Sequence, residues 1–324
     1  MKDLVLVITF WERKLYLERI LEYYNSFEKE TLPYIIIVDQ SEHTWEDKIQ
    51  SPAIDEWLHL PNLNFYEMQK FVINHTKKKY FFLLSDDDFA IPSSLEMGVN
   101  FLDKNKEYIS ITGQIIQVKR KRNFTSLYGF QAWTKKGLSD NDKKVRLLNA
   151  FDNFKENTHI IYRSGTILKA LDIVINSIES KNSLAPIRYW GYILLLVSIL
   201  EGKVKNNLNC VSLVRSSRDL SGSVLGIDVS DTNNNDFPEY PKVLERDLKI
   251  ESIKDRINDQ NPLSDFVSKH LEIDFTSSTQ IILQLFGNNV SYSILDKLKF
   301  SFPSYKKSEK NKIKKIKKLI YKKV

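Results

Sequence analysis

KYFFLLSDDDF, residues 79–89, joins a run of five apolar residues to three consecutive aspartates. An apolar run without polar alternation is typical of a strand covered on both faces, as in a parallel α/β sheet. Ligand sites in such sheets lie beyond the carboxyl ends of the strands. The stretch therefore predicts a buried strand that delivers a charge cluster to a ligand site. The structural alternative is an acidic loop or a helix N-terminus, because Pro92-Ser93-Ser94 follows closely.

The three aspartates, Asp86, Asp87 and Asp88, indicate a cation. Adjacent carboxylates repel one another unless a positive group lies among them. Mg²⁺ and Mn²⁺ take oxygen ligands and are commonly held by one or two carboxylates together with substrate phosphates. The cluster therefore predicts a divalent metal site of the kind that also binds phosphate.

Two earlier apolar runs predict further strands of the same sheet. LVLVITF, at 4–10, is followed by a helical pattern of apolar residues, and YIIIVDQSE, at 34–42, contains Asp39 at the end of its apolar part. A second helical pattern, at 66–78, leads into the acidic strand. Strands that alternate with helices form βαβ units with right-handed crossovers. We therefore expect Thr9, Asp39 and the acidic cluster to meet at one edge of the sheet.

This order of strands and polar residues resembles the nucleotide-sugar-binding half of family-2-type glycosyltransferases, which have the GT-A fold. The resemblance covers residues 3–110. It implies an α/β fold with a mostly parallel, GT-A-like (Rossmann-like) sheet flanked by helices. It also implies a nucleotide-sugar donor and a D-x-D motif that handles the ribose and the divalent cation, Mn²⁺ or Mg²⁺.

The site residues of the family carry over to this sequence by position. The resemblance implies that Thr9 and Phe10 line the nucleotide and that Asp39 faces the base. It places Asp86 near the ribose and the metal, and Asp88 on the metal. Two further donor-site candidates are Asp87, the middle residue of the acidic cluster, and Lys70, which lies on the predicted helix before the acidic strand. A solvated helix position explains the lysine equally well.

The second half of the chain departs from the family pattern at the catalytic base. A strongly apolar helix is predicted within 190–206, and in the family such a helix often starts with an acidic pair that supplies the base. Trp190 and Gly191 occupy those positions here. An inverting transfer needs a carboxylate or histidine to deprotonate the acceptor hydroxyl. The residues that could act as base from the preceding segment, each also explained as structural or solvated, are Glu156, His159, Asp172 and Glu179.

Two arginines follow a late predicted strand, NCVSLVRSS at 209–217. Guanidinium groups bind phosphate through two parallel hydrogen bonds, so Arg215 and Arg218 are candidates for contact with the donor diphosphate. Ordinary surface positions explain them equally well.

The length of 324 residues favours one α/β domain with an appended part over a single compact core. We expect a nucleotide-sugar-binding half at 1–110 and an acceptor-binding half at 111–228. An Asn-rich linker then opens a mainly helical extension at 229–304, and a Lys-rich tail occupies 305–324.

The net charge of +7 is concentrated in that tail. Residues 305–324 contain ten lysines and one glutamate, and subtracting their +9 leaves −2 for residues 1–304. A slightly acidic body argues against a nucleic-acid partner, because such binders carry a basic face on the folded domain. The other basic cluster, KRKR at 119–122, is interpreted as a solvated loop.

The tail has the pattern of an amphipathic helix. Its lysines flank apolar residues at helical spacing, namely Ile313, Ile316, Leu319 and Ile320. This pattern is typical of a helix that lies on an anionic membrane surface, where each lysine contributes about 1 kcal/mol. A solvated tail is the structural alternative.

Cys210 is the only cysteine, which excludes an intrachain disulfide framework and is compatible with a reducing cytosol. The N-terminus leads directly into a β-branched strand that is too short for a signal peptide. No segment reaches the roughly 18 apolar residues of a membrane span. We therefore expect a cytoplasmic protein bound peripherally to the inner face of the membrane.

These features predict a metal-dependent glycosyltransferase, expected to invert configuration, that moves a sugar to a saccharide or lipid-linked glycan in bacterial capsule or lipopolysaccharide assembly. One alternative is a nucleotidyltransferase, although FWERK at 10–14 lacks the glycine-rich loop usual there. Another is a catalytically silent donor-binding or scaffold protein at the membrane, which the missing acidic pair favours. The sequence has neither Walker A nor Rossmann glycine motifs, which weakens NTPase and dehydrogenase interpretations.

Overall fold

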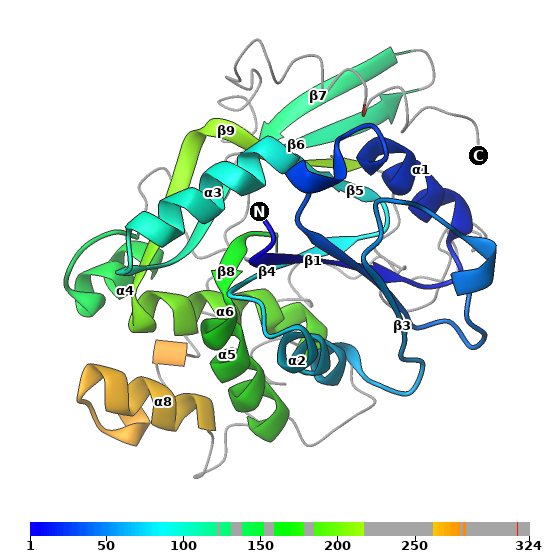
Figure 1. Ribbon diagram of the computed structural model, residues 1–324. Helices are drawn as coiled ribbons and strands as arrows, with labels where there is room; N and C mark the ends of the chain where they lie inside the picture. The colour runs from blue at the N-terminus through cyan, green and yellow to red at the C-terminus, as the bar shows by residue number, and fades with distance from the viewer. Residues whose placement is uncertain are drawn as a thin grey trace.

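The chain folds around a mixed sheet with helices on both faces (Figure 1). The computed structural model describes residues 1–121, 124–130, 138–151, 159–177, 185–216, 262–278, 281–282 and 316. The strands are β1 (Leu4–Phe10), β2 (Tyr34–Asp39), β3 (Glu56–His59), β4 (Tyr80–Ser85), β5 (Asp88–Ala90), β6 (Tyr108–Lys121), β7 (Phe124–Phe130), β8 (Ile161–Arg163) and β9 (Lys203–Ser216). The helices are α1 (Lys14–Tyr24), α2 (Phe65–Thr76), α3 (Pro92–Lys104), α4 (Lys143–Phe151), α5 (Ser164–Ser177), α6 (Ala185–Glu201) and α8 (Pro262–Leu271), with short 3₁₀ turns η1 (Lys29–Thr31) and η2 (Glu46–Lys48).

The N-terminal half of the sheet is parallel. Its strands lie side by side in the order β3-β2-β1-β4, and Thr9 of β1 pairs with Val38 of β2 and Ser85 of β4. The carboxyl ends of these three strands are therefore level with one another. This arrangement confirms the predicted α/β fold and the prediction that three strand ends meet at one edge.

The other half of the sheet mixes directions. The order continues β8-β6-β9-β5, with β8 antiparallel to β4 and β6, β6 parallel to β9, and β5 antiparallel to β9. Asp86 and Asp87 form the turn between β4 and β5, and Asp88 is the first residue of β5. The chain therefore leaves one region of the sheet and enters another within the acidic cluster.

Side-chain alternation along each strand feeds two hydrophobic cores, one on each face of the sheet. In β1, Leu4, Leu6 and Ile8 pack with the buried residues of α1 and α3, whereas Val5 and Val7 pack with those of α2, α5 and α6. Figure 1 shows these two groups of helices on opposite sides of the sheet. Burial on both faces explains why the sequences of the central strands are continuous apolar runs.

Helix α2, which precedes the acidic strand, starts at a capping box. The side chain of Asn64 accepts the N–H groups of Tyr66 and Glu67, and the Glu67 carboxylate accepts the Asn64 N–H. These bonds satisfy helix-terminal donors that would otherwise lack partners. Lys77, in the left-handed region at φ 52°, ends the helix and turns the chain into β4.

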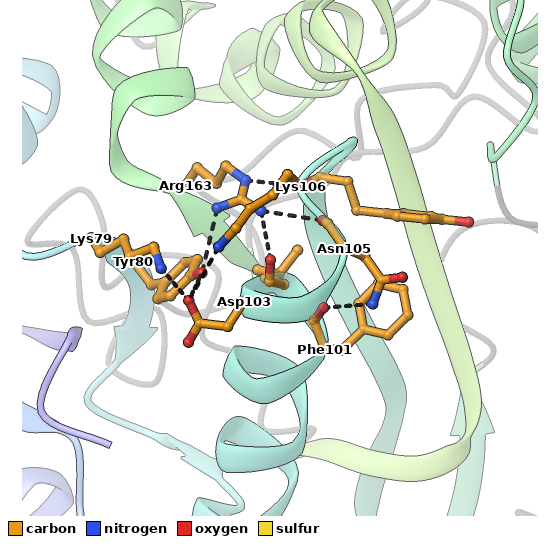
Figure 2. Close-up of polar contacts among 9 residues, drawn as sticks. Lys79, Tyr80, Phe101, Asp103, Asn105, Lys106 and Arg163 are labelled. Atoms are coloured by element: carbon orange, nitrogen blue, oxygen red, sulfur yellow. Dashed lines mark hydrogen bonds and ion pairs between the residues drawn. The ribbon is translucent and has the colours of Figure 1, made fainter.

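Helix α3, which follows β5, is fixed at its C-terminal end by Arg163 of β8 (Figure 2). The guanidinium donates to the carbonyl oxygens of Leu102 at 2.7 Å, Asn105 at 3.2 Å and Tyr108 at 2.9 Å. A cation at a helix C-terminus also interacts favourably with the helix dipole. Arg163 therefore ties α3 to the central sheet.

Some elements of the second half differ in extent from the predictions. The apolar helix α6 extends from Ala185 to Glu201, and residues 203–206, which lie within the range given for the predicted helix, belong to β9 because they pair with β6. Residues 119–121 of the KRKR cluster lie in β6, paired with β7, and not in a loop. β6 spans residue 110, the expected boundary between the two halves of the domain, and that division stays a prediction.

Ile316 is the one residue of the Lys-rich tail that the structure describes. It is helical and fully buried in the hydrophobic cluster that contains β1 and α1 residues. This differs from the membrane-facing position expected for its side chain. Across the described part of the chain, no helix has both the length and the apolar character to span a bilayer.

Candidate functional site

The candidate site lies where the loops after β1, β2 and β4 meet, joined by a continuous set of polar contacts. The Asp39 carboxylate accepts the Ser41 N–H at 3.0 Å, and the Ser41 hydroxyl accepts the Glu12 N–H at 3.0 Å. Arg13, the next residue, donates from Nη1 to Asp86 Oδ1 at 2.7 Å. The ends of β2, β1 and β4 are thus connected in that order.

Arg13 is a site residue that the sequence reasoning missed. Its guanidinium also lies 3.5 Å, Nη2 to Oδ2, from Asp87, and only 16% of its side chain is exposed. Its position just beyond the end of a predicted strand could have indicated a site residue from the sequence. The pairing of β1 with β4 places the loop that carries Arg13 against the acidic cluster.

Asp86 is a buried carboxyl, 4% exposed, in contact with Arg13. Burial, with smaller contributions from Asp87 and Asp88, raises its pKa from the usual 3.8 to about 8, although Arg13 opposes the shift. The buried environment therefore disfavours a bare carboxylate at Asp86. A bound cation would favour the charged form by supplying an opposite charge.

His159 is the base candidate that the structure brings to the cluster. Its Nε2 lies 3.8 Å from Asp88 Oδ2, and its Nδ1 lies 3.2 Å from the Leu83 carbonyl oxygen. A carbonyl only accepts hydrogen bonds, so we assign the proton to Nδ1. The other ring nitrogen, Nε2, is directed toward the acidic cluster and can accept a proton when the ring is neutral.

Arg215 is paired with Asp88 in the antiparallel register of β5 and β9. The backbone of this predicted phosphate-binding residue therefore lies beside the acidic cluster, and its side chain is outside the described atoms. Three other candidates fall outside the described residues: Arg218, Glu156 and Glu179.

Asp39 is fully buried and supports the loop that follows β2. One carboxylate oxygen accepts the Ser41 N–H, and the other accepts the Trp45 N–H at 2.9 Å. Each oxygen has a second lone pair, so these bonds leave acceptor capacity for a base. The structure gives Asp39 a structural role, and its predicted contact with a base stays a prediction.

Thr9 and Phe10 end β1 but differ in environment. Thr9 is half-buried, level with the start of the acidic turn. The Phe10 side chain is 2% exposed and packs edge-on against Trp45 and Trp57, with ring centroids 6.2 and 6.0 Å away. The nucleotide contact implied for Phe10 would therefore involve its backbone.

Lys70 and Asp172, predicted as a donor-site residue and as a base candidate, pair with each other. Lys70 Nζ of α2 lies 2.7 Å from Asp172 Oδ1 of α5, and both side chains are exposed. An ion pair that joins two packed helices explains both residues in this structure. Their predicted roles at the site stay predictions.

The donor atoms at the cluster are of the type that a hard divalent cation uses. Within the described residues, no three His, Cys, Asp or Glu side chains form a complete metal-binding group. Asp86 and Asp88 are nevertheless buried side chains with carboxyl oxygens, and both belong to the acidic cluster. One or two carboxylates suffice for Mg²⁺ or Mn²⁺ when phosphate oxygens complete the coordination. The residues therefore fit a cation that is bound together with a phosphate ligand.

Comparisons with known proteins give a likeness in structure only. No protein-family model matches this chain, and no curated protein sequence matches it. Among solved structures, residues 1–349 of TarS from S. aureus match with a TM-score of 0.53 and 12% identity, covering 99% of this chain and 81% of that one. The same TarS segment in complex with UDP matches with a TM-score of 0.52. A longer TarS chain matches with a TM-score of 0.51 and 11% identity, and the match covers 47% of it.

At these identities the comparison concerns the fold. TarS is a GT-A glycosyltransferase, and the present chain has the same type of α/β fold. The GT-A fold implied by the sequence is thereby confirmed.

Proposed function

We propose that this chain is a glycosyltransferase that transfers a sugar from a nucleoside-diphosphate sugar to a saccharide or lipid-linked glycan. The observation that carries the proposal is the set of contacts that joins Asp39, Arg13 and Asp86 across three parallel strand ends. Ligands of open α/β sheets bind at such strand ends. The GT-A fold and the acidic cluster support this reaction class over nucleotidyl transfer.

The donor in this proposal carries a diphosphate, with UDP as the first nucleotide to test because a structural neighbour was solved with UDP. Asp86 and Asp88 hold Mn²⁺ or Mg²⁺, and Asp87, Thr9 and the β2 loop border the nucleotide. A bound divalent cation supplies charge stabilisation for the departing diphosphate. Arg215 and Arg218 are the proposed additional phosphate contacts.

We assign the role of general base to His159. Its Nε2 faces the acidic cluster and can accept the proton of an acceptor hydroxyl, as an inverting transfer requires. Replacement by glutamine should lower the transfer rate by about 10² or more and leave donor affinity close to normal. Full activity of His159→Gln would exclude this role.

The proposal also places the acceptor glycan at a membrane surface. The tail at 305–324 would bring the enzyme to an anionic membrane at its cytoplasmic face, where lipid-linked glycans of capsule, lipopolysaccharide or related surface polymers are assembled. The tail's ten lysines support this placement.

The deciding experiment measures nucleotide binding. Wild-type protein is titrated with UDP and other nucleoside diphosphates, with and without Mn²⁺, by calorimetry and thermal shift. A ligand at 100 times its dissociation constant stabilises the protein by about 2.7 kcal/mol. Asp88→Asn keeps the side-chain shape and should abolish the metal-dependent part of binding, whereas Asp265→Asn, an exposed position on α8, should not. Absence of binding by the wild type, or unchanged metal dependence in Asp88→Asn, would contradict the proposal.

A donor-binding scaffold is the second candidate, favoured by one observation. Trp190, at the position of the family's acidic pair, is 1% exposed and packs on Tyr66 at 5.6 Å, so it belongs to the core. A wild-type protein that binds a nucleotide-sugar yet neither hydrolyses nor transfers it would support the scaffold function.

A further inference from the structure

Arg13 is held against the acidic cluster by the loop between β1 and α1. Glu12, the preceding residue, adopts φ 49°, a left-handed conformation that is costly for a residue with a side chain, and its N–H is bound by Ser41. The Arg13 carbonyl accepts the first amides of α1, from Tyr16 at 2.9 Å and Leu17 at 3.2 Å. The backbone at Arg13 is thus fixed from both sides.

The guanidinium itself is stacked on an aromatic ring. Its Cζ lies 4.0 Å from the Tyr16 ring centroid, and Arg19 Cζ lies 4.3 Å from the same centroid. A cation over an aromatic face is stabilised by the ring quadrupole. The stack confines the guanidinium plane while leaving its hydrogen-bonding edge toward Asp86 and Asp87.

In this position Arg13 would compete with a metal for Asp86. The Nη1 group lies 2.7 Å from Asp86 Oδ1, and a second cation on that oxygen would meet like-charge repulsion in a buried environment. A donor diphosphate changes the balance, because a guanidinium binds phosphate oxygens through two parallel hydrogen bonds. Movement of Arg13 from Asp86 to the diphosphate would free the carboxylate for the cation.

We propose that Arg13 is a positioning residue that makes divalent cation and nucleoside diphosphate bind cooperatively. Without nucleotide, the guanidinium occupies the oxygen atoms of Asp86 and Asp87 and keeps the affinity for metal alone low. With nucleotide, it binds the diphosphate, and Asp86 becomes available to the cation. Coupling between two ligands is reciprocal, so each raises the affinity of the other by the same factor. This inference rests on the proposed donor site and adds that the cation and the nucleotide bind to it cooperatively.

The test uses full-length protein and binding measurements that do not depend on turnover. Affinities for Mn²⁺ alone, UDP alone and each in the presence of the other are measured for wild type, Arg13→Ala, Arg13→Lys and Lys14→Ala. In Arg13→Ala we expect Mn²⁺ alone to bind about tenfold tighter, and UDP in saturating Mn²⁺ to bind about tenfold weaker, so that the cooperativity disappears. A purely structural role for Arg13 would weaken both ligands together.

Two variants control for the fold and for charge. Lys14→Ala removes a neighbouring cation that pairs with Glu18 at 3.6 Å on the exposed side of α1, and it should bind both ligands like the wild type. Arg13→Lys keeps the charge without the two-pronged geometry and should retain weak metal binding with reduced cooperativity.

The outcomes separate this inference from the proposed function. If the wild type binds UDP with Mn²⁺ but Arg13→Ala has unchanged Mn²⁺ affinity, the inference is overturned and the proposed function stands. If the wild type binds no nucleoside diphosphate, the proposed function and the cooperative role both fail.

Discussion

At the scale of single residues, Asp86 links the chemistry of the site to stability. Its raised pKa of about 8 means that the native carboxyl retains a proton that the unfolded chain loses near 3.8. The stabilising contribution is fully present below the unfolded pKa and is lost as the pH rises through about 8. Each pH unit inside this window changes the free energy of unfolding by up to about 1.4 kcal/mol.

This linkage predicts different pH profiles for wild type and Asp86→Asn. Asparagine mimics the neutral carboxyl and does not titrate, so the melting temperature of the variant should rise relative to that of the wild type between about pH 4 and pH 8 and then level off. Melting curves in a chelator, without nucleotide, measure the difference. Parallel profiles would show that Asp86 titrates normally in the folded protein.

Asp39 allows a second prediction at this scale. In Asp39→Ala the N–H groups of Ser41 and Trp45 lose their acceptor, and each unsatisfied buried donor costs about 1–3 kcal/mol. The variant should unfold at lower denaturant concentration and, because Ser41 positions Glu12 and Arg13, bind UDP more weakly. Asp39→Asn retains one acceptor and should be less affected. Normal stability in the alanine variant would exclude the structural role.

At the scale of elements, strand β5 and helix α3 form the part of the chain that contains Asp88 and the helix that follows it. β5 contributes Asp88, and α3 begins two residues after β5 ends. Helix ends leave carbonyl groups without partners inside the helix. Arg163 satisfies those of α3 from β8, as Figure 2 shows, so the helix that follows β5 is held at its C-terminal end by a distant strand.

Arg163→Met should therefore lower the free energy of unfolding by about 2–4 kcal/mol, because several buried carbonyl groups lose a charged donor while the aliphatic packing is kept. Urea denaturation measures the effect. Lys106→Met is the matched control, since Lys106 is exposed and reaches Asp103 only at 3.8 Å. Equal loss in both variants would show that Arg163 does not support α3 specifically.

At the scale of the whole molecule, the tail is connected with one of the two hydrophobic cores through Ile316. Ile316 belongs to the cluster formed by one face of β1, β2 and β4 with α1 and α3. The tail that carries the positive charge therefore also contributes to the core of the α/β domain. A role in membrane attachment and a role in stability are both expected of it.

Deletion of residues 305–324 should have two separable effects. Sedimentation with anionic vesicles should be lost, since the remaining chain has a net charge of −2, and wild-type binding should weaken as salt screens the lysines. The melting temperature should fall because Ile316 leaves the core, with Ile316→Ala reproducing about 2–5 kcal/mol of destabilisation without removing charge. Vesicle binding by the truncated chain would place the membrane contact elsewhere.

The sequence by itself determined the local elements. β1, β2 and β4 and the helices between them follow from apolar patterns within short windows, because burial on two faces leaves a continuous apolar run. The spacing also placed Asp39 and the Asp86–Asp88 cluster at strand ends, since parallel strands joined by helices expose their carboxyl ends at one edge.

Only the tertiary structure decided which of these groups meet. Arg13 reaches Asp86 because β1 is the neighbour of β4, and His159 reaches Asp88 because the chain returns to β4 through β8. Asp88 itself lies in a strand because β9 pairs with it from more than a hundred residues away. No short window contains both partners of such a contact. The sequence therefore supplied the charged groups, and the long-range order of the strands decided which of these groups lie next to one another.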